Sequence, residues 1–296
     1  MPTTLHVSDV TTTRGARKVI AFSLQSGSNG NCLYVETDGT RLLFDAGISG
    51  IEAERRLAGH GRMIVDVDAV ILSHEHGDHC RAAGVYSRKY GLPVYVTPTT
   101  LQAINSKAAI PNSGRVRHFS AGDVLRFGSV RVETLSTAHD AVDGVAFVVA
   151  DGRRRLGILT DLGHPFDELS DIVESLDAMF LESNYDPDML RSGPYPWWLK
   201  TRIMSDGGHL SNEEAAQLVA QSGKRFCWVC LAHLSEKNNA PGMAVEAHRR
   251  IAGHDQHLSV APRYSVGELL RVERARPKAI AAQQRSPAPH GSGLRP

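Results

Sequence analysis

The segment SHEHGDH, residues 73–79, constrains the fold more than any other part of this sequence. It follows the apolar residues 69–72, so a predicted strand runs directly into a loop that carries imidazole and carboxylate groups. Packing such groups this densely is costly unless a cation binds them, and together they suit zinc or manganese. The alternative is a polar surface loop, which needs no such set of ligands. The candidate ligands in this loop are His74, His76, Asp78 and His79.

One loop cannot supply all the ligands of two metal ions, so other segments must reach it. The chain contains 14 histidines, so residue type alone does not identify a ligand. Position does, because loops that leave the ends of strands gather into binding sites. Three further candidates each lie just after an apolar segment that we predict to be a strand: His139, Asp161 and His233.

The order of predicted elements indicates one α/β domain, with two mixed sheets packed face to face and helices outside. The predicted strands are residues 19–25, 31–37, 41–47, 69–72, 93–98, 115–120, 123–128, 130–137, 144–151, 155–161, 177–183, 226–233 and 257–261. The predicted helices are residues 51–57, 80–90, 101–106, 166–175, 213–221 and 243–251, with an irregular stretch before the fifth of them. Asp38-Gly39 is typical of a tight hairpin turn.

The two ends of the chain differ in composition from its middle. Residues 1–17 are polar, and residues 273–296 are basic and rich in Ala, Gln, Pro and Gly, so we expect disordered tails around a catalytic domain of residues 18–272. The sequence has no apolar run of the roughly 20 residues that span a bilayer, and no apolar secretory segment at its start. We therefore expect a cytoplasmic protein without membrane contact, and no protein partner can be inferred.

The ligand pattern resembles the metallo-β-lactamase superfamily, in which HxHxDH is followed by a His, an Asp and a His in that order. The resemblance covers residues 20–260 and implies a four-layer αββα sandwich in a single domain. It also implies two divalent metal ions, zinc or manganese. One would be held by His74, His76 and His139 and the other by Asp78, His79 and His233, with Asp161 bridging them. Asp45 matches the aspartate that orients the ligand loop through hydrogen bonds.

Three segments point to one branch of the superfamily: residues 26–32, 180–203 and 205–216 resemble the WalJ/YycJ-type group of 5′-to-3′ DNA exonucleases. The resemblance implies a phosphodiesterase that uses a hydroxide held between the two metals as its nucleophile. The alternative is a hydrolase of a small phosphodiester or thioester on the same metal site. A non-catalytic scaffold is disfavoured because the ligand set is complete.

Residues outside the ligand set are candidates for catalysis and for DNA binding. The predicted catalytic residues are Asp78, His209 as a general acid, and Glu182, which would hold the proton of that histidine. Trp197 and Trp198 can stack on bases or can pack on the sandwich, and the sequence leaves both alternatives open. The predicted substrate-binding residues are Ser211 and Asn212 at a capped helix start, and the basic residues Arg191, Lys200 and Arg202.

Overall fold

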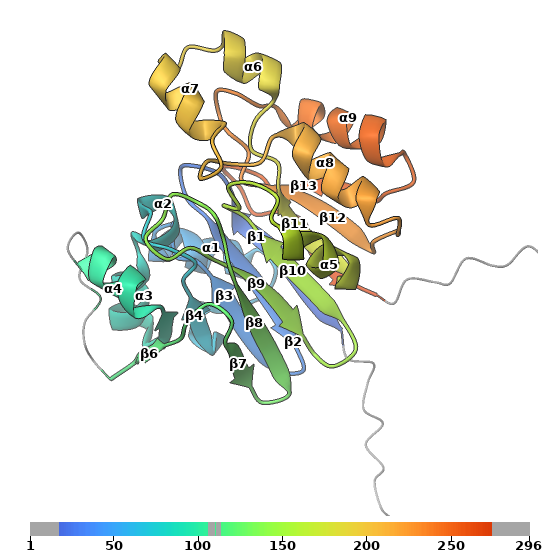
Figure 1. The fold of residues 1–296 in the computed structure, drawn as a ribbon. Helices are drawn as coiled ribbons and strands as arrows, with labels where there is room; N and C mark the ends of the chain where they lie inside the picture. The colour runs from blue at the N-terminus through green and yellow to red at the C-terminus, as the bar shows by residue number, and fades with distance from the viewer. Residues whose placement is uncertain (1–17, 106–109, 111–113, 274–296) are drawn as a thin grey trace, which may run out of the picture.

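Two sheets lie face to face at the centre of a computed structural model that describes residues 18–105, 110 and 114–273 (Figure 1). The first sheet has the order β14-β1-β2-β3-β4-β5-β6, and it is antiparallel from β14 to β3 and parallel from β3 to β6. Its strands are β1 (Val19–Gln25), β2 (Cys32–Thr37), β3 (Thr40–Phe44), β4 (Ala69–Ile71), β5 (Val94–Val96), β6 (Val116–His118) and β14 (Leu270–Val272).

The second sheet repeats this arrangement with the order β13-β12-β11-β10-β9-β8-β7. It is antiparallel from β7 to β10 and parallel from β10 to β13, so β8, β10, β11 and β12 all run in one direction. Its strands are β7 (Val124–Phe127), β8 (Val130–Ser136), β9 (Val145–Ala150), β10 (Arg155–Leu159), β11 (Ala178–Glu182), β12 (Trp228–Ala232) and β13 (Leu258–Val260).

Helices cover the outer face of each sheet. The helices are α1 (Gly50–Ala58), α2 (Gly77–Cys80), α3 (Ala83–Tyr90), α4 (Pro98–Asn105), α5 (Asp167–Ser175), α6 (Pro187–Ser192), α7 (Trp197–Ile203), α8 (Asn212–Gln221) and α9 (Pro241–Ala252), with a 3-10 turn η1 (Ile64–Asp66). No helix in the described ranges is long and apolar enough to cross a bilayer.

Alternating side chains along the strands divide the core into three apolar clusters. In β12, Trp228 and Cys230 point into the cluster between the two sheets, while Val229 and Leu231 point to the helices α5, α8 and α9. In β3, Phe44 joins the cluster between the sheets, and its neighbour Leu43 packs toward α1 and α3. Three apolar clusters require four layers, and the predicted αββα sandwich is confirmed.

Local sequence explains several of these boundaries. The β2–β3 hairpin turns at Asp38 and Gly39, both with positive φ, as the Asp-Gly pair predicts. Ser211 caps α8, and Glu214 completes a capping box with it.

The structure differs from the sequence-based prediction at three places. The helix predicted over residues 80–90 begins later, at Ala83 of α3, and a separate short helix, α2, precedes it and ends at Cys80. The predicted irregular stretch contains two short helices, α6 and α7, and the three residues of β14 were missed although they extend the first sheet. Residues 1–17 and 274–296, which hold the predicted disordered tails apart from Glu273, lie outside the described residues.

Candidate metal centre

All seven predicted ligands meet at one edge of the sandwich, where loops leave the strands. The loop after β4 and the short helix α2 supply four of them. The other three follow β8, β10 and β12, whose carboxyl ends share one edge of the second sheet because these strands run in the same direction. Each sheet therefore contributes a part of the cluster that neither could form alone.

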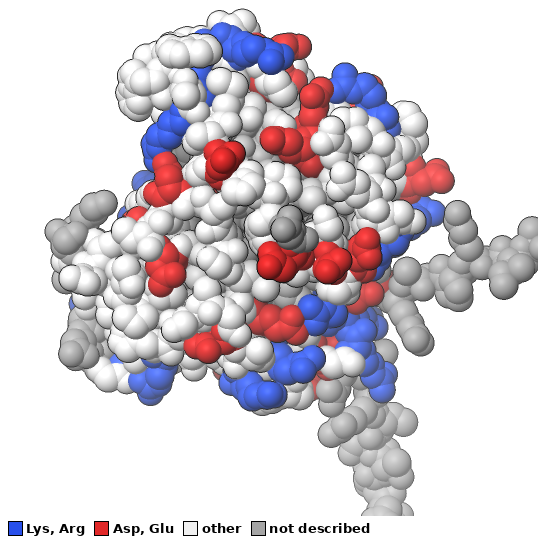
Figure 2. Space-filling view, in the orientation of Figure 1, with Lys and Arg blue, Asp and Glu red and all other residues white. Residues whose placement is uncertain are grey.

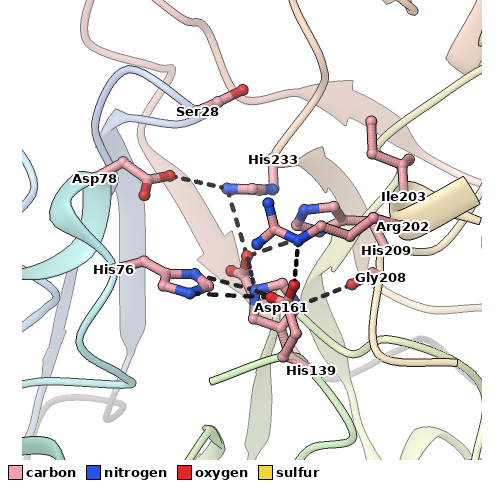
Figure 3. A pocket seen from close by; sticks show the side chains of 11 residues that line it. Ser28, His76, Asp78, His139, Asp161, Arg202, Ile203, Gly208, His209 and His233 are labelled. Carbon is pink, nitrogen blue, oxygen red and sulfur yellow. Dashed lines mark hydrogen bonds and ion pairs between the residues drawn. The ribbon is translucent and has the colours of Figure 1, made fainter. Parts of the chain in front are cut away.

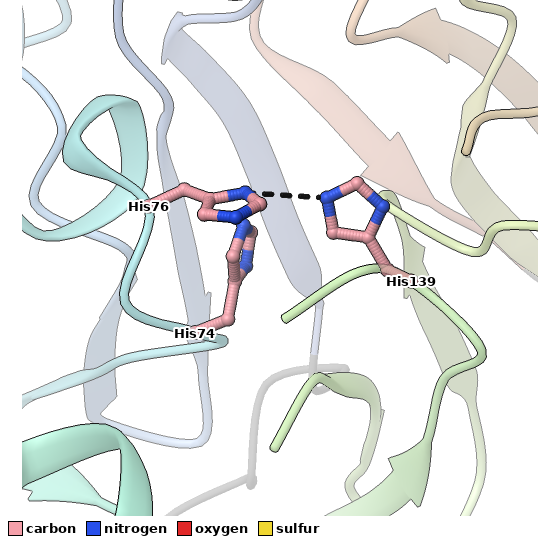
Figure 4. Close-up of side chains that lie close together, drawn as sticks. All are labelled: His74, His76 and His139. Carbon is pink, nitrogen blue, oxygen red and sulfur yellow. Dashed lines mark hydrogen bonds between the residues drawn. The ribbon is translucent and has the colours of Figure 1, made fainter. Parts of the chain in front are cut away.

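His74, His76 and His139 form the first set (Figure 4). They offer three ring nitrogens that lie within 4.8 Å of one another. His76 Nδ1 and His139 Nε2 are 3.3 Å apart, and the buried His74 Nε2 has no hydrogen-bond partner among the described residues. Buried polar atoms are almost always paired, so three imidazoles in this arrangement fit a cation that accepts their lone pairs.

Asp78, His79 and His233 form the second set, again within 4.8 Å of one another. Asp78 Oδ2 lies 3.5 Å from His79 Nε2 and 3.5 Å from His233 Nε2. One carboxylate and two imidazoles suit zinc or manganese, so this set fits a second cation.

Asp161 lies between the two sets. Its Oδ1 is 3.8 Å from His139 Nε2 and 3.5 Å from His233 Nε2, while its Oδ2 is 3.4 Å from His79 Nε2. Among the described residues, no hydrogen bond reaches the buried Asp161 Oδ2. A carboxylate that touches both sets and has one oxygen without a hydrogen bond fits the bridging position that the resemblance implies.

Hydrogen bonds on the outer side of the cluster orient the imidazoles. His79 Nδ1 donates to Asp45 Oδ2 at 2.7 Å, and His139 Nδ1 donates to the carbonyl oxygen of Gly208 at 2.8 Å. His74 Nδ1 lies 2.9 Å from the Oγ of Ser73, whose backbone N–H also donates to Asp45. These contacts leave Nε2 of each ring facing the centre of the cluster, which is the arrangement a metal ligand needs. Asp45 thus has the contacts predicted for it.

The electrostatic field of the cluster favours positive charge. Burial lowers the pKa of His74 well below its ordinary value, so this ring is neutral and its lone pair is available. Burial would also lower the pKa of His233, but Asp161, Asp78 and Glu182 raise it to about 10. The carboxylates likewise raise the pKa of His79 above its ordinary value. Protons on these two rings occupy the place that a divalent cation would take, so metal binding would release them.

Three residues of the cluster have left-handed backbone conformations. The φ angles are 66° at Asp45, 58° at Asp161 and 55° at His233. Such angles are uncommon outside glycine and concentrate at functional sites. Each residue stands just after a strand, where the reversed conformation turns its side chain back toward the cluster.

Asn31 is a site residue that the sequence analysis did not single out. Its Nδ2 lies 3.3 Å from Asp78 Oδ2 and 3.0 Å from His79 Nε2, and its Oδ1 accepts from the backbone N–H of Gly27 at 2.8 Å. Its backbone N–H donates to the carbonyl oxygen of Asp78 at 2.7 Å. Gly47 packs so closely here that an added Cβ would collide with that carbonyl group. The turn of residues 26–31 therefore borders the site.

His209 and Glu182 lie together beside the cluster, as predicted. His209 Nδ1 donates to Glu182 Oε1 at 2.7 Å, and Glu182 Oε2 accepts from the backbone N–H of Leu162 at 3.0 Å. Glu182 is fully buried at 0% exposure. Burial would raise the pKa of this carboxyl, but the charges of His209 and His233 hold it below its usual range. The ionised Glu182 therefore orients the His209 ring through this hydrogen bond.

A pocket of about 150 Å³ opens onto the cluster (Figure 3). His76, Asp78, Asp161 and His209 line it, so both sets and the predicted acid face one space. Arg202 is the only Lys or Arg among the lining residues in the described part of the chain. Its Nε is paired with Asp140, which follows His139 and also lines the pocket.

Other predicted substrate-binding residues have different surroundings. Lys200 is only 8% exposed, and its Nζ donates to the carbonyl oxygen of Arg191 at 2.6 Å, a position that does not favour phosphate binding. Arg191 is exposed and pairs with Asp188. Ser211 caps α8, and Asn212 is buried with its Nδ2 donating to Asn239. Neither residue lines the pocket.

Comparison with known proteins identifies relatives in sequence and in fold. A family model described as "Beta-lactamase superfamily domain" matches residues 40–233. The chain is 40% identical over 222 residues to an exodeoxyribonuclease, YycJ, of Bacillus anthracis, which covers 75% of this chain and 84% of the relative. It is 40% identical over 224 residues to the exodeoxyribonuclease WalJ of Streptococcus pneumoniae, with 75% and 83% of the two chains covered.

The fold is shared with solved structures of low sequence identity. The crystal structure of the metallo-β-lactamase fold protein YhfI from Bacillus subtilis matches with a TM-score of 0.67 and 18% identity. The match covers 86% of this chain and 99% of that one.

Proposed function

The chain belongs to the metallo-β-lactamase superfamily and is a hydrolase of that superfamily, and on this premise we propose that it is a metal-dependent exonuclease that removes nucleotides from the 5′ end of DNA. The observation that carries the proposal is the pocket in which both ligand sets, His209 and Arg202 face one space. The similarity to exodeoxyribonucleases over more than four fifths of their length supports DNA as the substrate class.

The cluster fits two divalent cations. In the part of the chain that the structure describes, no hydrogen bond reaches the buried Nε2 of His74 or Oδ2 of Asp161, and a cation would satisfy both. The first set with Asp161 would hold one cation, and the second set with Asp161 the other. When bound, the cations activate water as the nucleophile and neutralise the charge that develops on the phosphate. Asp78, which we propose as ligand and catalytic residue, also lines the pocket.

The role proposed for His209 is to protonate the leaving oxygen. The 3′-oxygen of a nucleotide is a poor leaving group unless it receives a proton, and His209 lines the pocket without belonging to either set of proposed ligands. Because Glu182 accepts from Nδ1, a proton on Nε2 is free to be transferred. The hydrogen bond from Nδ1 to Glu182 keeps the ring oriented between turnovers.

Arg202 is the group we propose to bind the phosphate. It stands at the end of α7, lines the pocket and is half exposed at 53% of its side chain. Its pairing with Asp140 holds the guanidinium over the pocket, and an exposed pair of this kind costs little to exchange for a phosphate oxygen.

The size of the pocket favours a substrate that extends beyond it. Pockets that enclose a small ligand measure about 300–1,000 Å³, whereas this one measures about 150 Å³. It can hold a reacting phosphodiester, while the rest of the substrate must lie on the surrounding surface. This argues against the alternative, hydrolysis of a small phosphodiester or thioester, for which the pocket would supply most of the contacts.

A digestion panel tests the proposal. Full-length protein loaded with zinc or manganese is incubated with single- and double-stranded DNA and RNA labelled at either end, and with a chromogenic phosphodiester. We expect mononucleotides to be released progressively from the 5′ end of DNA, and no release by the matched variant Asp161→Ala. Cleavage of the small diester alone, at a rate that DNA does not match, would support the alternative and contradict the exonuclease.

A further inference from the structure

The segment of residues 187–203, here called the arm, stands outside the four layers. It contains α6 and α7, which lie above the edge of the sandwich where the metal centre is found (Figure 1). Trp197 and Trp198, at the start of α7, are 72% and 67% exposed, which excludes the prediction that they pack on the sandwich. The third tryptophan of the chain, Trp228, is only 2% exposed.

Tryptophans are buried in most proteins, so two adjacent exposed ones indicate a contact surface. Figure 2 shows uncharged surface over α7, with Lys and Arg side chains over α6 and along the flank of α7. Exposed aromatic rings bordered by basic side chains are the arrangement that binds single-stranded nucleic acid, because bases stack on the rings and phosphates pair with the cations. The exposed pair of Arg191 with Asp188 is easily exchanged for a phosphate.

The arm is fixed to the pocket rather than loosely attached. The Nζ of buried Lys200 donates to the carbonyl oxygen of Arg191 and so ties α7 to α6. At the C-terminal end of α7, the carbonyl oxygen of Ile203 accepts from the backbone N–H of His209 at 3.0 Å, and Arg202 pairs with Asp140. A helix held to α6 and to the pocket in this way presents its tryptophans with a small ordering cost when a strand binds.

The length of α7 sets the distance between the tryptophans and the reacting phosphate. From Trp197 to Ile203 the helix rises about 9 Å at 1.5 Å per residue. Ile203 lines the pocket, so Trp197 begins roughly 9 Å along the helix from it. A strand whose bases keep the stacked spacing of a duplex advances about 3.4 Å per nucleotide, so this length corresponds to about three nucleotides.

We propose that Trp197 and Trp198 form a stacking platform for single-stranded DNA about three nucleotides from the phosphate that is cleaved. The inference rests on the proposed exonuclease function and adds a single-strand subsite to it. A duplex keeps its bases stacked inside, so only an unpaired end can use the platform. The continuity of α7 with the pocket favours the substrate strand as occupant over a second copy of the chain or a lipid surface.

The experiment measures binding and cleavage separately. Full-length, metal-loaded protein is titrated with single-stranded DNA carrying phosphorothioate linkages, and tryptophan fluorescence is recorded. Trp228 is buried, so quenching reports Trp197 and Trp198. The variants are Trp197→Leu, Trp198→Leu and the matched phenylalanine replacements at both positions. Ile51→Ala, which removes an exposed apolar side chain from α1, is the control.

For each leucine variant we expect affinity and kcat/KM on an oligonucleotide of about twelve nucleotides to fall by about 5- to 150-fold, with partial recovery in the phenylalanine variants. A dinucleotide is too short to reach the platform, so its cleavage should not change. Two results would overturn the inference while leaving the exonuclease intact: equal losses on the dinucleotide and the longer strand, or leucine variants that bind DNA like the wild type. A wild-type dimer that dissociates in the leucine variants would assign the surface to a second copy instead. If wild-type protein does not cleave DNA at all, it is the proposed function that fails.

Discussion

Replacing His209 separates proton transfer from the other tasks of the pocket. His209→Ala removes the ring whose Nδ1 donates to Glu182 at 2.7 Å. In the described structure this ring makes no hydrogen bond to the ligand loop of residues 73–79, so the substitution should leave that loop in place. General acid catalysis contributes about 10²- to 10⁴-fold, so turnover on DNA should fall by that range. A nitrophenyl phosphodiester, whose leaving group needs no proton, should lose much less.

Glu182→Gln tests the same pair from the other side. The contact between Glu182 and His209 is a hydrogen bond to a charged group, which is worth about 1.5–3 kcal/mol. Replacing the carboxylate with a neutral amide weakens this contact and loosens the orientation of the ring. Turnover on DNA should therefore fall by about 10- to 100-fold, while the nitrophenyl phosphodiester should lose much less, which a purely structural defect would not produce.

The assay compares steady-state rates on the two substrates and measures metal content by elemental analysis. Metal content near two per chain in both variants is the expected control. Equal slowing of both substrates by His209→Ala would mean that the residue positions phosphate. Loss of metal would indicate that His209 is a ligand. Its ring lies close enough to Asp161 and His233 for the three to share a cation.

Three other outcomes follow from the structure. His76→Ala should abolish hydrolysis and lower metal content while the circular dichroism spectrum stays that of the wild type; a fully active variant would contradict the ligand assignment. Asn31→Ala removes contacts to Asp78 and His79, so the affinity for one of the two cations, measured by titration with a chelator, should fall by about 10- to 100-fold. An unchanged affinity would mean that Asn31 only shapes the turn. His248 is buried, neither of its ring nitrogens has a hydrogen-bond partner among the described residues, and burial lowers its pKa to about 4 from 6.5. Below pH 6.5 the unfolded chain binds a proton at this residue that the folded chain does not bind, so the free energy of unfolding of the wild type should fall by about 3 kcal/mol relative to that of His248→Leu between pH 6.5 and 4. An equal pH dependence of the two free energies, measured by chemical denaturation, would refute this.

The ligand cluster was predictable because its members obey one local rule. Each follows an apolar strand, and an apolar run next to a polar residue is visible without the fold. His233 and Asp78 are 155 positions apart, yet both were identified from their immediate neighbours. The sandwich was predictable from the order of apolar strands and helices along the chain. Strands that are buried on both faces, with helices between them, can form layers in only a few ways.

Contacts between distant segments could not be read from the sequence. Asn31, which the sequence analysis did not single out, meets Asp78 across 47 positions, and Arg202, which it did name, pairs with Asp140 across 62. Lys200 is of a residue type that binds phosphate, but its Nζ donates a hydrogen bond to a backbone carbonyl oxygen of α6. Helices as short as α6 and α7 have weak intrinsic preferences and exist because tertiary contacts hold them, so the pattern of their sequence could not reveal them.

The left-handed conformations of Asp45, Asp161 and His233 set the stability of the fold against the integrity of the metal centre, which matters for evolution and for engineering. Each such residue costs on the order of 1 kcal/mol or more, which the fold tolerates because the side chain is needed. Glycine would remove that cost and the function together. A lineage that no longer needed the reaction would therefore gain stability from single substitutions at these positions, and selection for a stable fold alone would erase the centre. The same reasoning warns a designer that a stabilised variant of this chain found by screening must be checked first at these three residues.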